Sequence, residues 1–186
     1  TYLPAAPDNA RILSGSNAQQ YFSFYATHDG GVYQRVTGIT SGTQLRFSIN
    51  AYIWSSNLND LNLSEGDGNV FGRAGIDPTG GTDARSANVV WSPNVEQYDA
   101  YNLYVVTATA SGNAVTVFFE TTISDPVQTY IYLDDASLSV VSVASNPSPT
   151  NTVAPSSTST NTPRPTATTS QATPSDGGII PTATNT

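Results

Sequence analysis

The sequence predicts an all-β protein, a two-sheet antiparallel β-sandwich followed by an extended Ser/Thr/Pro-rich tail. Three observations support this fold class. Residues 44–54 alternate between apolar and polar side chains without a break, which is the period of a β-strand. Short strand-like segments separated by turn formers fill most of the chain, and none shows a sustained helical period. The composition changes at Asn146, where Ser, Thr, Asn, Ala and Pro take over.

The strand at residues 44–54, QLRFSINAYIW, has the clearest pattern. Successive side chains of a strand point to opposite faces of its sheet. The set expected to face the core is Leu45, Phe47, Ile49, Ala51 and Ile53. The opposite set is Gln44, Arg46, Ser48, Asn50, Tyr52 and Trp54. Because this second set combines hydrogen-bonding groups with two aromatic rings, it is unusual for a face that only meets water.

The other strands are identified by β-branched and aromatic residues bounded by Gly, Pro, Asn and Asp. The full set of predicted strands is 18–27, 32–39, 44–54, 70–77, 89–91, 98–110, 114–122 and 130–143. The predicted connections are a turn at 28–31, loops at 55–69 and 78–86, and a tight hairpin at 111–113. In the first strand, Phe22 and Phe24 share one face, and Tyr21 and Tyr25 share the other. About 145 residues are ample for one two-sheet core.

The chain divides into an N-terminal arm at 1–9, a sandwich domain at 10–145 and a tail at 146–186. The tail has too little apolar surface to offset the entropy lost on ordering, so we expect it to be extended. Hydroxyl residues interrupted by proline are also typical of O-glycosylated stalks. The candidate O-glycosylation sites are Thr150, Thr152, Thr158, Thr160, Thr162, Thr166, Thr168, Thr169 and Thr173.

The charge and the missing residue types limit the functions open to this chain. Its net charge is -8, which disfavours binding to nucleic acid and to anionic membrane surfaces. It contains no Cys, which excludes disulfides and thiolate metal sites. No apolar run approaches the roughly 20 residues that a membrane helix needs. We expect an extracellular or cell-surface protein whose signal peptide has been removed.

The face that holds Arg46, Asn50, Tyr52 and Trp54 is the first candidate binding site. Sugars stack their C–H faces on aromatic rings, and their hydroxyls bond to Arg and Asn, so these side chains suit a glycan ligand. The alternative is that the two rings lie under a loop or in a subunit contact, where aromatic residues and Arg are common.

Signals for catalysis are weak. The only histidine, His28, lies in a predicted turn, and the chain has no second His or Cys for a zinc triad or a Cys/His dyad. A glycosidase needs two facing carboxylates, for which Glu96 and Glu120 are conceivable. A further acidic group lies in the 55–69 loop, at Asp60, Glu65 and Asp67, without the spacing of an EF-hand. We therefore expect a protein that is not an enzyme.

Four segments together resemble a known family. They are GGVYQRVTGITSGTQLRFSINAYIW (30–54), GIDPTGGTD (75–83), NVVWS (88–92) and YLDDASL (132–138). They resemble the jelly-roll, galactose-binding-like domains of secreted bacterial proteins, which include many carbohydrate-binding modules. The resemblance covers roughly 10–143 and implies a jelly-roll sandwich. Relatives open with a strand that contains an Asn-x-x-Phe-Glu type motif, and no such strand precedes Arg11 here. In relatives that strand supplies part of a structural calcium site, whose other part resembles Asp134.

Two functions follow as alternatives. The first is a structural subunit that assembles with copies of itself into a glycosylated filament or surface layer, because a sheet that lacks its first strand needs a partner at its edge. The donor of that strand is then Tyr2 and Leu3 of the arm, which we favour, or Ile179 and Ile180 of the tail. The second is a carbohydrate-binding module on a flexible stalk, with polysaccharide as its partner.

Overall fold

The computed structural model describes residues 11–57, 63–64 and 69–142. The chain forms two units, Thr1–Asn146 and Pro147–Thr186, and every described residue belongs to the first. The expected donor segments, the expected glycosylation sites and the loop acids Asp60, Glu65 and Asp67 lie outside the described residues. Within the described residues, no helix is long and apolar enough to cross a membrane.

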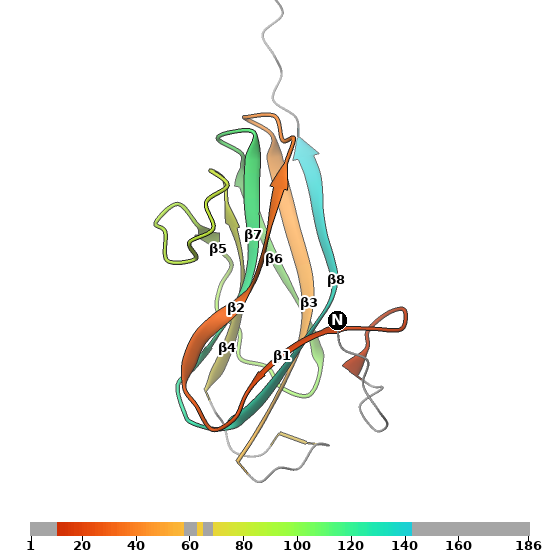
Figure 1. Cartoon of the computed structure of the whole chain (residues 1–186). Coiled ribbons are helices and arrows are strands. Elements are labelled where there is room, and N and C mark those ends of the chain that lie inside the picture. The colour runs from red at the N-terminus through yellow and green to blue at the C-terminus, as the bar shows by residue number, and fades with distance from the viewer. Residues whose placement is uncertain (1–10, 58–62, 65–68, 143–186) are drawn as a thin grey trace, which may run out of the picture. The chain divides into compact units, whose positions relative to one another are not determined.

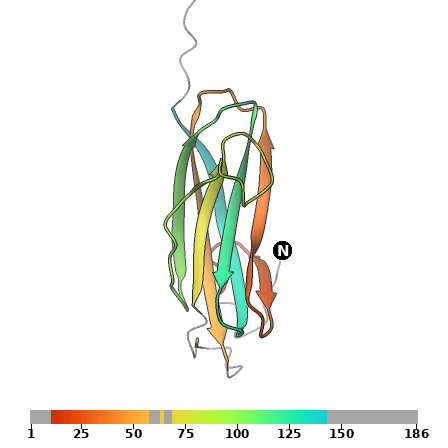
Figure 2. The same cartoon turned by 90° about the vertical axis from the view of Figure 1, so that its left-hand side faces the viewer.

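The described residues of the domain form eight strands (Figure 1). They are β1 (Gln19–Ser23), β2 (His28–Thr37), β3 (Gln44–Ser56), β4 (Val70–Asp77), β5 (Val90–Trp91), β6 (Tyr101–Thr109), β7 (Ala114–Ile123) and β8 (Gln128–Ser142). They form two four-stranded sheets with the orders β1-β8-β3-β6 and β2-β7-β4-β5, and neighbouring strands are antiparallel. These orders are those of an eight-stranded jelly roll, so the predicted fold class is confirmed. Figure 2 turns the molecule so that β7, β4 and the loop after β4 face the viewer.

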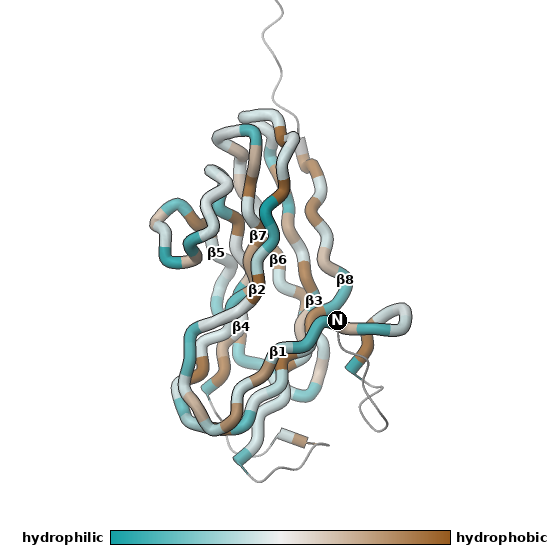
Figure 3. The backbone as a smooth tube through the Cα atoms, in the orientation of Figure 1, coloured by the Kyte–Doolittle hydropathy of each residue, from teal (hydrophilic) through white to brown (hydrophobic). Residues whose placement is uncertain are grey.

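The core lies between the two sheets and follows the predicted alternation of β3. All five residues of the core-facing set of β3 are at most 4% exposed and belong to one apolar cluster. The opposing sheet contributes Phe119 and Ile123 from β7 and Ile76 from β4 to the same cluster. Hydrophobic residues accordingly recur along the strands in Figure 3. Burial of these side chains is what holds the sheets together.

The predicted turn at residues 28–31 is wrong, because these residues begin β2. His28 lies opposite Ile123, and the ladder with β7 continues without interruption to Thr37. The glycines serve close strand approach instead of a turn: a Cβ at Gly31 would lie 1.9 Å from the Phe119 carbonyl oxygen. The chain reverses earlier, where Tyr25 has a φ of 49° and its N–H donates to the Val127 carbonyl at 3.1 Å.

Candidate functional site: an open cleft between the sheets

The face expected to bind a glycan is covered. Trp54 is 0% exposed and Tyr52 is 8% exposed, and both pack with Ala18 and Tyr132 on the outer face of β3 and β8. The Tyr130 ring lies 5.1 Å from that of Trp54, centroid to centroid. Both rings are therefore buried under other parts of the chain, as in the alternative expectation. Trp54 offers no open surface on which a sugar could stack.

Arg11 is the residue that covers this aromatic cluster. It is 3% exposed, and its guanidinium carbon lies 5.4–5.6 Å from the ring centres of Tyr52, Trp54 and Tyr132, within cation–π range. The Arg11 carbonyl accepts a hydrogen bond from the Tyr101 hydroxyl at 2.6 Å. Burial raises the pKa of Tyr52 above its ordinary value. Sequence reasoning missed this role, because nothing local to Arg11 shows that it packs on the rings of Tyr52, Trp54 and Tyr132, the last of them 121 positions later.

The other two residues of the expected site lie elsewhere on the same strand. Arg46 and Asn50 are both partly buried, and neither belongs to the cluster around Trp54. Asn50 lies opposite Asp134 of β8, and the Arg46 carbonyl accepts a long hydrogen bond from Ser139 Oγ at 3.4 Å. The four residues therefore share a strand face in the expected alternation but do not form one site.

Asp134, the expected calcium ligand, is occupied with backbone groups. Its Oδ2 accepts from the N–H groups of Leu13 at 2.9 Å and Ser14 at 3.2 Å, and its Oδ1 accepts from the N–H of Asp135 at 2.8 Å. Within the described residues no group of three or more His, Cys, Asp or Glu side chains could hold a metal ion. The Asp134 carboxylate thereby fixes the segment that carries Arg11, and the calcium site expected at Asp134 stays a prediction.

The residues weighed for catalysis make structural contacts. Glu120 Oε2 accepts from Arg73 Nε at 2.9 Å and Nη2 at 2.6 Å, and Glu96 accepts from the Tyr98 hydroxyl at 2.8 Å. His28 lies in the β2 ladder, where burial lowers its pKa below the ordinary value. These contacts explain the three residues without assigning them a reaction.

Part of β8 has no neighbour on one side because β8, Gln128–Ser142, is much longer than β1, Gln19–Ser23. The β1 ladder occupies only Thr129–Leu133 of β8. From Asp134 to Ser142, β8 pairs with β3 on one side and with no other described strand on its second side. On the facing sheet, β2 pairs only with β7 among the described strands. Among the described strands, these two edges are unpaired, and both border the same opening.

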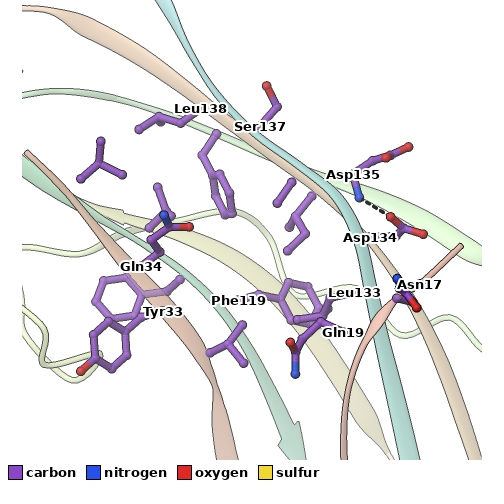
Figure 4. Close-up of a pocket in the computed structure, with 18 residues that line it drawn as sticks. Asn17, Gln19, Tyr33, Gln34, Phe119, Leu133, Asp134, Asp135, Ser137 and Leu138 are labelled. Carbon is purple, nitrogen blue, oxygen red and sulfur yellow. Dashed lines mark hydrogen bonds between the residues drawn. The ribbon is translucent and has the colours of Figure 1, made fainter. Parts of the chain in front are cut away.

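A cleft of about 710 Å³ lies in this opening (Figure 4). Its floor is the hydrophobic core itself, with Phe47, Ile49, Phe119 and Leu133 at the bottom. Partly buried residues that pack against the core form its walls, namely Val32 and Val36 of β2 and Leu138 of β8. Polar side chains gather at its rim, including Asn17, Gln19, Gln34, Asp134, Asp135 and Ser137.

Val140 continues the apolar wall beyond the cleft. It lies opposite Leu45, whose side chain is buried in the core, yet Val140 is 56% exposed. A valine on the inner face of a sandwich strand is normally covered by side chains of the facing sheet. The exposure of Val140 therefore marks the path along which an additional strand would bury apolar surface.

Comparisons with known proteins add two distant structural similarities. No family model matches the sequence, and no curated protein matches it. The sugar-binding C-terminal domain of EclA is 11% identical, with a TM-score of 0.40 over 74% of this chain and 89% of that one. A family 16 carbohydrate binding module-2 is 11% identical, with a TM-score of 0.43 over 68% of this chain and 79% of that one. Both are described as sugar-binding or carbohydrate-binding domains; at these scores they carry no argument about the ligand of this chain.

Proposed function

We propose that this chain is an extracellular, non-enzymatic structural subunit that assembles with copies of itself by strand complementation. The observation that carries the proposal is the cleft between β2 and β8, where two strand edges that no described strand pairs flank an apolar floor. In this assembly, the cleft of one copy takes up an extended segment of the next copy.

A β-strand suits this cleft better than a compact ligand for two reasons. The backbone groups of β8 from Asp134 to Ser142 form a ladder on one side only, and a strand would pair with the other side. Alternate side chains of that strand would also cover the Leu138 and Val140 side chains. An exposed row of unpaired backbone N–H and C=O groups is a template for pairing with another chain, so proteins cover or pair such edges.

The N-terminal arm is the donor that we favour. The arm offers the apolar residues Tyr2 and Leu3 and contains none of the candidate O-glycosylation sites, although Pro4 limits the length of any ladder. The tail offers Ile179 and Ile180 as the competing donor. Donation from one copy to the next is a heterologous contact, which propagates as a fibre unless the rotation closes a ring.

Carbohydrate binding is the second candidate function. The open aromatic surface that this function needs is not at Trp54, where Arg11 occupies the ring faces. Binding of a polysaccharide therefore requires an exposed ring elsewhere on the domain, and one such ring exists at Tyr33, which is 60% exposed.

A charge placed beside the cleft tests the assembly. In Val140→Asp the new carboxylate would be buried by a donor strand, which is costly, whereas in the isolated domain it stays in water. We expect this variant to be a folded monomer by light scattering and electron microscopy while the parent protein polymerises. Leu103→Asp is the matched control, because Leu103 is 52% exposed and lies opposite Asn50 on the outer face of the same sheet. A parent protein that stays monomeric at high concentration, or equal assembly of Val140→Asp, contradicts the proposal.

A further inference from the structure

The strand β6 forms a second long sheet edge, at the end of its sheet opposite β1. It pairs with β3 over its whole length, from Tyr52–Tyr101 to Gln44–Thr109, without a register shift. Among the described strands, none pairs with the other side of β6. The strand therefore presents an uninterrupted edge nine residues long, which is not part of the cleft between β2 and β8.

The bonds at the end of β6 show which backbone groups point to this edge. The Ala110 N–H donates to the Thr43 carbonyl at 2.9 Å, and the Ala110 carbonyl accepts from the Gly42 N–H at 2.7 Å, so both groups of Ala110 point toward β3. In an antiparallel ladder this direction alternates from one residue to the next. The odd-numbered residues from Tyr101 to Thr109 therefore direct their N–H and C=O groups away from β3.

The edge of β6 lacks the features that protect most exposed sheet edges. Soluble proteins place Lys, Pro or a bulge on such an edge, or keep it very short. β6 contains no charged residue, Pro or Gly, and its centre, Tyr104, Val105 and Val106, strongly favours a strand. By contrast, β2 at the edge of the other sheet carries Asp29 and Arg35, and β1 and β5 span only five and two residues.

A second copy of this chain is the partner that the edge fits. The chain has a net charge of -8, so two copies repel each other over most of their surfaces. No charged residue occurs between Asp99 and Glu120, which is the longest uncharged run among the described residues. Two copies can therefore bring their β6 strands together without placing like charges directly opposite each other.

The strand is also complementary to itself. Two identical antiparallel strands are related by a two-fold axis, which here passes beside Val105, the midpoint of β6. Leu103 then lies opposite Thr107 of the partner subunit, and Tyr101 lies opposite Thr109 of the partner subunit. All of these are odd-numbered residues, so their outward N–H and C=O groups meet and complete a ladder.

We propose that β6 pairs with β6 of a second copy about this axis and so joins neighbouring filaments side by side. One such edge contact is small, and two free domains held by it alone separate readily. Filaments repeat the contact along their length, and repetition makes a weak contact hold. The lateral role rests on the filament proposed above, whereas the β6 pairing itself does not depend on the cleft.

Val105→Cys tests the pairing in the full chain, which has no other cysteine. Directly opposite residues of a hydrogen-bonded pair have Cα atoms about 5.5 Å apart, which is within disulfide range. Under oxidising conditions we expect a disulfide-linked dimer on a non-reducing gel. We expect it in the parent background and also, at high protein concentration, in combination with Val140→Asp, so that failure of strand donation leaves this result intact.

Val141→Cys is the matched control, because Val141 is 55% exposed and lies on β8, away from the β6 edge. This variant should stay monomeric on the same gel. The pairing is overturned if Val105→Cys forms no more dimer than Val141→Cys in either background.

Val105→Pro tests the lateral role. The Val105 N–H points away from β3, so its loss removes no bond within the domain, and Pro is tolerated on a free edge. By electron microscopy we expect the parent filaments to associate side by side and the Val105→Pro filaments to stay single. Val106→Pro, which removes an N–H that points to β3, should unfold the domain instead. Single filaments of the parent, or side-by-side filaments of Val105→Pro, contradict the lateral role. Loss of the filaments themselves from folded Val105→Pro would assign β6 to the donor strand, and would equally overturn the proposal.

Discussion

Replacement of Trp54 by alanine tests whether its ring is part of the buried interior or a surface ring that stacks on a ligand. The Trp54 side chain is 0% exposed, and it contacts the Tyr130 ring at 5.1 Å and the Arg11 guanidinium at 5.6 Å. Removing a fully buried Trp deletes its transfer free energy and leaves a cavity, which together cost about 3–5 kcal/mol. Loss of the cation–π contact with Arg11 belongs to the same cost. For a domain with a total stability of about 5–15 kcal/mol, this is a large fraction.

The assay is urea unfolding followed by far-UV circular dichroism, with parent and variant at equal monomer concentration. We expect the free energy of unfolding of Trp54→Ala to fall by about 3–5 kcal/mol. Phe24→Ala is the aromatic control, because Phe24 is 54% exposed, and its loss should cost about 1 kcal/mol or less. A Trp54→Ala variant as stable as the parent would refute the assignment of Trp54 to the interior. Trp54 would then again be a candidate residue for stacking on a ligand.

Three further predictions follow from the structure and the sequence. Gly31→Ala should destabilise the domain by about 1–3 kcal/mol, since its Cβ collides with the backbone of β7, whereas Gly112→Ala, with no heavy atom within 4 Å of its Cβ, should be close to neutral in the same unfolding assay. Burial lowers the pKa of His28 in the fold, so the domain is most stable above the unfolded pKa of histidine, near 6.5, and loses stability as the pH falls below it. His28→Gln should flatten that part of a profile of unfolding free energy against pH, and an unchanged profile would exclude the effect. The tail should carry O-linked sugars between Thr150 and Thr173, which intact-mass and peptide mass spectrometry of the natural protein would show as hexose-spaced excess over the 19.5 kDa chain.

The sequence was sufficient to predict the sandwich and much of its core. The period-two pattern of β3 identifies the buried residues, because burial on one face of a sheet determines which side chains are apolar. The bounds of β4, Val70–Asp77, also agree with the predicted strand. At His28 the prediction failed, because a Gly-Gly pair indicates a turn when judged locally. Here the pair permits close approach of β7, which depends on a partner more than 80 residues away.

The candidate sites were harder to predict, because they depend on what lies over a strand. Alternation places Tyr52 and Trp54 on the outer face of β3, but it says nothing of the Arg11 segment that covers them. The cleft arises from the unequal lengths of β1 and β8, which only their register reveals. The stacked Tyr33 and Phe118 likewise come from different strands, paired across the ladder. In each case a long-range contact, absent from any local pattern, decides the environment.

The most direct measurement of strand complementation is a disulfide between the arm of one copy and the cleft of another. The chain has no cysteine, so Leu3→Cys and Leu138→Cys can be placed in separate chains, one with a mass tag, and mixed under oxidising conditions. A disulfide requires Cα atoms within about 7 Å, so it reports that the arm lies beside Leu138. We expect the mixed disulfide dimer on a non-reducing gel, and none when Leu103→Cys, on the outer face of the sheet, replaces Leu138→Cys. Absence of the mixed dimer from samples that still polymerise would contradict donation by the arm, and equal crosslinking to both positions would contradict binding in the cleft.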